Sequence, residues 1–88
     1  MTIKELKIKF KELEQLEKRC DKAEREYELD PENELKEINF DFLYWEEYTL
    51  FDSICKEIAN LIKVDYKVVR LLVSTKRKEL ISILERCA

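Results

Sequence analysis

The sequence predicts an all-α fold, a small bundle of four to five helices within a single domain of residues 1–88. Three observations lead to this prediction. The chain has no glycine and only one proline, so it lacks the glycine that tight hairpin turns favour. Apolar residues recur at steps of three and four along most of its length, as they do on one side of an amphipathic helix. Finally, 88 residues are too few for two independent hydrophobic cores.

A long amphipathic helix is expected at the amino terminus, over residues 3–29. Thr2 and Glu5 have the spacing of a capping box, in which the two side chains satisfy free backbone N–H groups of the first turn. The apolar stripe of this helix consists of Ile3, Leu6, Phe10, Leu13, Leu16, Cys20, Ala23 and Tyr27. The stripe departs from a strict heptad, so we expect it to pack on helices of the same chain, with a homodimer through residues 3–27 as the alternative.

A second helix, acidic and aromatic, is expected over residues 31–48, because Asp30 suits a helix cap and Pro31 suits the first helical position. A third helix is expected from Leu50, with Thr49 as its cap, although the sequence leaves open whether residues 31–62 form one helix or two. Alternate residues from 38 to 44 are also apolar, as in a strand. A single strand would have no partner in this chain, so we favour the helix.

Aromatic residues are concentrated in this second helix. Six of the nine lie within twelve positions: Phe40, Phe42, Tyr44, Trp45, Tyr48 and Phe51. One side of a helix cannot bury them all, because the stripe of Leu35, Ile38, Phe42 and Trp45 projects roughly opposite Phe40, Tyr44 and Tyr48. One interpretation is a central helix wrapped by the others. The other is an exposed patch that binds a basic protein surface, with the candidate residues Phe40, Tyr44, Trp45, Glu46, Glu47 and Tyr48.

The segment from residue 58 to residue 72 has the apolar pattern of two helices joined by a tight turn. The residues that carry it are Ile58 and Ala59, Ile62 and Val64 around the turn, Asp65 as a cap, and Val69 and Leu72. In these respects residues 50–73 resemble the helix-turn-helix family. That family usually has glycine where this chain has Lys63, and a left-handed lysine would cost about 1 kcal/mol. The resemblance implies a carboxy-terminal half, residues 50–86, that contains a helix-turn-helix-like unit and a final helix.

The same resemblance implies DNA binding. The candidate nucleic-acid-binding residues are Tyr66, Lys67, Arg70, Lys76, Arg77 and Lys78. Lys67 and Arg70 carry donors that suit the acceptors of guanine, and residues 76–78 would add contacts to phosphates.

The charges are divided along the chain. The formal charge is +2 for residues 1–20, −9 for residues 21–52 and +4 for residues 53–88. Because an acidic segment repels nucleic acid, any such contact is expected in the carboxy-terminal third.

We expect no catalysis, cofactor, metal site or small-molecule substrate. The chain has no histidine and no glycine loop, and its carboxylates alternate with lysine and arginine as on solvated helix surfaces. Cys20, Cys55 and Cys87 are widely spaced, which fits reduced thiols packed as small apolar residues and argues against a zinc site. The sequence shows neither a membrane-spanning apolar run nor a secretion signal, so we expect a cytoplasmic protein with no membrane partner.

The segment Leu29-Asp-Pro-Glu-Asn-Glu34, the acidic aromatic helix after it and the lysine-rich final helix resemble small uncharacterised proteins of phages and mobile elements of Gram-positive bacteria. This resemblance implies a regulatory or host-interaction role. Two hypotheses follow. The favoured one is a non-enzymatic regulator that binds DNA through the helix-turn-helix-like unit. The alternative is an acidic protein-binding adaptor or inhibitor that acts through residues 40–52.

Overall fold

Four helices make up most of the chain. The computed structural model describes the backbone of residues 2–87 and the side chains of residues 2–86. The helices are α1 (Ile3–Leu29), α2 (Glu34–Ile62), α3 (Tyr66–Thr75) and α4 (Arg77–Cys87). No strand occurs among the described residues, so the all-α prediction is confirmed and the alternative of a strand near residues 38–44 is wrong. None of the helices described has a segment both long and apolar enough to cross a membrane.

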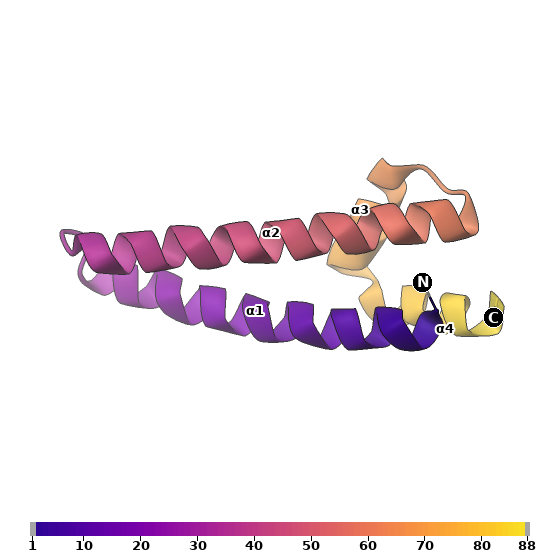
Figure 1. Ribbon diagram of the computed structural model, residues 1–88, viewed down its shortest axis with the longest axis horizontal. Coiled ribbons are helices and arrows are strands. Elements are labelled where there is room, and N and C mark those ends of the chain that lie inside the picture. Colours follow the sequence, from indigo (N-terminus) through magenta and orange to yellow (C-terminus); the bar gives the residue numbers. More distant parts are fainter. Residues whose placement is uncertain (1, 88) are drawn as a thin grey trace.

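The two long helices, α1 and α2, form an antiparallel hairpin that runs the length of the molecule (Figure 1). The shorter α3 and α4 pack on this hairpin at one end only, the end that also holds both termini. The molecule is elongated, with extents of 48 × 21 × 20 Å. We call its four-helix end the head (residues 2–13 and 49–87) and its two-helix end the arm (residues 14–48).

The start of α1 is the predicted one, because the N–H of Glu5 donates to Thr2 Oγ1 at 3.2 Å. The predicted start of the next helix at residue 31 is wrong. Asp30 closes α1 by donating its N–H to the Tyr27 carbonyl, and Asn33 caps α2, its Oδ1 accepting from the N–H groups of residues 35 and 36. Residues 30–33 are needed as a turn, since the chain must reverse its direction before α2 can pack antiparallel to α1.

α2 is one helix of 29 residues, so the predicted boundary at Thr49 is wrong. No glycine or proline interrupts residues 34–62. The side of α2 that faces α1 also continues past Thr49, from Leu43 through Leu50 to Ile54. Packing against α1 therefore favours continuation of the helix over a capped break.

Residues 63–65 connect α2 to α3. Lys63 adopts the left-handed conformation, with φ 55° and ψ 41°. Asp65 caps α3, its carboxylate accepting from the N–H of Lys67 at 2.8 Å. Val69 of α3 is fully buried and Leu72 is half-buried, which places both toward the core as predicted.

The buried side chains form two separate clusters. The head contains Leu6, Phe10, Leu13, Ile54, Cys55, Ile58, Val69, Val73, Leu80 and Leu84, and the arm contains Cys20, Ala23 and Leu43. Most of the apolar stripe of α1 is thus buried within the chain, as expected. A homodimer through residues 3–27, the alternative, would need part of this same stripe.

Candidate functional site

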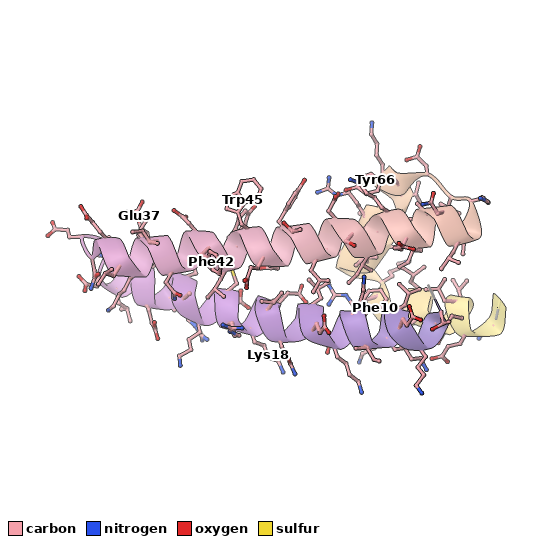
Figure 2. All side chains as sticks on the ribbon, in the orientation of Figure 1. Phe10, Lys18, Glu37, Phe42, Trp45 and Tyr66 are labelled. Carbon is pink, nitrogen blue, oxygen red and sulfur yellow. The ribbon has the colours of Figure 1, made fainter. Side chains whose placement is uncertain are left out.

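A row of exposed apolar side chains lies on α2, outside the side that packs on α1. Leu35, Ile38, Phe42 and Trp45 occupy it, each between 62% and 78% exposed. We call these four residues the outer seam. Figure 2 shows Trp45 projecting from α2 away from α1. The interpretation of α2 as a helix wrapped by the others is therefore wrong for the arm.

The seam is exposed because only one helix covers the arm. α1 packs along the opposite side of α2, and α3 and α4 lie at the head (Figure 1). Near the head the seam borders an open hollow of about 450 Å³, whose walls are almost entirely apolar and are formed by Phe42, Trp45, Glu46, Thr49, Leu50 and Ser53. An exposed apolar surface of this extent is typical of an interaction site.

The predicted protein-binding residues are distributed over different sides of α2. Trp45 lies in the seam and Glu46 beside it. Phe40 is half-buried against Tyr27 and Tyr44, with ring centroids 6.1 and 6.4 Å apart. Glu47 is half-buried near Cys20.

Tyr48 is 40% exposed and packs edge-on against Trp45, with ring centroids 6.1 Å apart. Leu35, Ile38 and Phe42 were missing from the predicted site. The signal that could have identified them is their spacing of three, four and three residues together with Trp45.

The residues beside the seam are mostly acidic. If the outer seam occupies the a and d positions of a heptad repeat, the e and g positions flank it on either side. These flanking positions hold Glu34, Asn39, Asp41, Glu46 and Tyr48. None of the five is basic. Arg19 and Lys22 of α1 lie near Asn39, so basic groups approach one edge only, and the other edge carries Glu34 and Asp41.

This local charge agrees with the charge of the two regions. The arm carries thirteen acidic and five basic side chains, a formal charge of −8, and the head carries seven acidic and twelve basic side chains, a formal charge of +5. Basic partners should therefore be attracted to the arm, and acidic partners to the head.

Three of the six predicted nucleic-acid-binding residues are engaged within the protein. Arg77 donates two hydrogen bonds to the carboxylate of Glu17, at 2.7 and 3.2 Å, and one to the Val73 carbonyl at 3.1 Å. Its guanidinium also lies 5.9 Å from the centre of the Phe10 ring. These bonds to Glu17 raise the pKa of Arg77 further. Arg77 joins α1, α3 and α4 and has little capacity left for a phosphate.

Tyr66 and Arg70 also contact α2. The hydroxyl of Tyr66 donates to Asp52, and the guanidinium of Arg70 lies over the rings of Phe51 and Tyr66 at 5.8 and 5.7 Å. The hydrogen bond to Asp52 raises the pKa of Tyr66 to about 12. The same bond, followed by the contact with Lys56, lowers the pKa of Asp52. Both shifts are consequences of the hydrogen bond that joins α3 to α2. The Tyr66–Asp52 pair therefore has a structural role.

The remaining three candidates, Lys67, Lys76 and Lys78, are exposed on the head. Lys67 lies on the first turn of α3, Lys76 separates α3 from α4, and Lys78 lies on the first turn of α4. The structure therefore gathers the six predicted residues at one end of the molecule but leaves only three of them, all lysines, unengaged.

The two described cysteine side chains are buried and free. Burial, followed by the neighbouring Glu47, raises the pKa of the Cys20 thiol to about 12, and burial raises that of Cys55 to about 11. Both thiols are protonated at neutral pH, which agrees with a packing role. Among the side chains that the structure describes, no group of three or more histidine, cysteine, aspartate or glutamate residues could hold a metal ion.

Comparison of the chain with protein families, with curated proteins and with solved structures gave no match.

Proposed function

We propose that this protein acts by binding another protein through its arm, as an adaptor or an inhibitor. The observation that carries the proposal is the exposure of the outer seam. Burying an apolar side chain of this size contributes about 1.5–3 kcal/mol, and four such side chains lie in one row without a covering element. The resemblance to small phage and mobile-element proteins agrees with such a role.

Capture of partners from a lysate of the source organism tests this proposal. The double variant Phe42→Glu, Trp45→Glu changes only exposed seam positions, so it should fold and yet lose the captured protein. The matched control is Val68→Glu, Leu71→Glu, which places the same charges on exposed apolar positions of α3 and should keep the partner. Circular dichroism checks that both variants remain helical. A seam variant that captures the same partner as the unchanged protein would contradict the proposal.

A second candidate function is DNA binding by the head. The observation that favours it is the position of the exposed Lys67, and of Arg70 over the rings of Phe51 and Tyr66, in a region of charge +5. The expected resemblance of residues 50–73 to the helix-turn-helix family agrees with this function. Fluorescence anisotropy with duplex DNA at low salt tests it. Binding that weakens when Lys67 and Arg70 become alanine supports it, and unchanged binding, or none at micromolar protein, contradicts it.

A further inference from the structure

The outer seam has the spacing of one side of a coiled coil. Leu35, Ile38, Phe42 and Trp45 alternate steps of three and four residues, and Thr49 continues the series. This repeat keeps side chains in line along a neighbouring helix. The row from Leu35 to Thr49 is about 21 Å long, at about 1.5 Å per residue. The next position of the repeat is Asp52, where Tyr66 of the head contacts α2.

We propose that the outer seam binds a single amphipathic helix of another protein, with basic residues along its apolar stripe. This inference rests on the proposed function and specifies its partner. A helix of about 15 residues would cover the seam. Its apolar residues would recur at steps of three and four, and its basic residues would face Glu34 and Asp41.

The backbone of α2 argues for a helical partner. Every N–H and C=O group in the middle of a helix is already hydrogen-bonded to its own chain, so the arm has no free strand edge to which an extended peptide could add. Recognition must therefore occur through side chains. The open hollow beside Phe42, Trp45 and Leu50 can receive one large apolar side chain of the incoming helix, as the knobs of a coiled coil fill the holes of their partner.

The flanking charges argue against a second copy of this chain as the occupant. In an antiparallel pair of α2 helices, the flanking positions would place Asp41 opposite Asp41. In a parallel pair, Asp41 of one copy would face Glu46 of the other. Like charges at these positions destabilise a coiled coil, whereas lysine or arginine in the same places would form ion pairs across the interface. The arm as a whole, at −8, also attracts a basic partner at longer range.

Two synthetic peptides test the inference with the full chain. Both carry leucine at positions 1, 4, 8 and 11, and they differ only in having lysine or glutamate at the flanking positions. Because Trp45 is the only tryptophan of the protein and lies in the seam, its fluorescence reports binding directly. We expect the lysine peptide to bind at least about tenfold more tightly than the glutamate peptide, with an affinity that falls as salt is added.

Variants locate the binding. Phe42→Glu should lower the affinity for the lysine peptide at least about tenfold. Leu71→Glu changes an equally exposed residue of α3 and should leave this affinity unchanged. Equal binding of both peptides, no binding of the lysine peptide at about 0.1 mM, or a larger effect of Leu71→Glu would overturn the inference. Light scattering that shows a dimer dissociated by Phe42→Glu would also overturn it and assign the seam to a second copy. A partner lost from the lysate by the seam variant, without binding of the lysine peptide, would retain the proposed function and reject only the basic helix.

Discussion

The head and the arm are built from the same two helices but differ in what covers them. Among the side chains of residues 2–86, ten are buried in the core that α3 and α4 complete in the head, and three are buried between α1 and α2 in the arm. The head is basic and the arm acidic. The difference shows that a helix hairpin can be anchored by a core at one end while apolar residues at its other end remain exposed.

The largest expected effect is the difference in unfolding free energy between truncation of a core residue and truncation of a seam residue. Ile58→Ala removes a fully buried side chain of the head and should lower the free energy of unfolding by about 2–5 kcal/mol. Phe42→Ala removes an exposed side chain of the arm and should change it by no more than about 0.5 kcal/mol. Urea unfolding of both variants measures the two values. If Phe42→Ala is as destabilising as Ile58→Ala, the seam is covered in solution and the contrast between the regions disappears.

A smaller effect concerns the local stability of the two regions. Cys20 belongs to the cluster of the arm and Cys55 to that of the head, so alkylation of each buried thiol requires opening of its own region. We expect Cys20 to react about tenfold faster than Cys55, a difference of about 1.4 kcal/mol in opening free energy. Mass spectrometry of the peptides that carry each cysteine gives the rates, with the denatured protein as reference. Equal rates in the native protein would mean that head and arm open as one unit.

The smallest effect is a pH dependence that belongs to the head. The folded protein raises the pKa of Tyr66 from 10.0 to about 12, so the unfolded chain loses this proton first as the pH rises. Its contribution is therefore complete below about pH 10 and is lost between pH 10 and 12. In unfolding measurements over this range, the unchanged protein should lose stability more steeply than Tyr66→Phe. Parallel curves would show that the bond to Asp52 does not contribute to the stability of the head.

Features fixed by neighbouring residues could be predicted from the sequence. The cap at Thr2, the extent of α1 and the turn at Lys63 each depend on side chains within a few positions of one another. The boundary at Thr49 was wrong because a threonine suits a cap locally, whereas the packing of α2 on α1 decides that the helix continues. That packing joins residues far apart in the sequence and leaves no local signal.

The candidate site could be predicted only in part. The density of aromatic residues predicts a site at residues 40–48. The exposure of each side chain, however, depends on which side of α2 packs on α1. That packing leaves Leu35, Ile38 and Phe42 exposed and half-buries Phe40 and Glu47. The hydrogen bonds between Arg77 and Glu17 could not be predicted from neighbouring residues either, because the two residues are 60 positions apart. Charge counting assigned Arg77 to a DNA-binding surface, whereas the fold uses it to join helices.

The left-handed lysine of the turn has a consequence for the unfolded state. Glycine at position 63 would fit the turn without steric cost, but it would also give the unfolded chain more conformations to lose on folding. Lys63 adopts the same turn at a cost of about 1–2 kcal/mol, which exceeds the gain of about 0.4–1 kcal/mol that a stiffer unfolded chain gives at an unstrained position. In a protein without a single glycine, the reduced entropy of the unfolded chain applies along the whole length, and among the described residues Lys63 is the position with positive φ where the absence of glycine is destabilising.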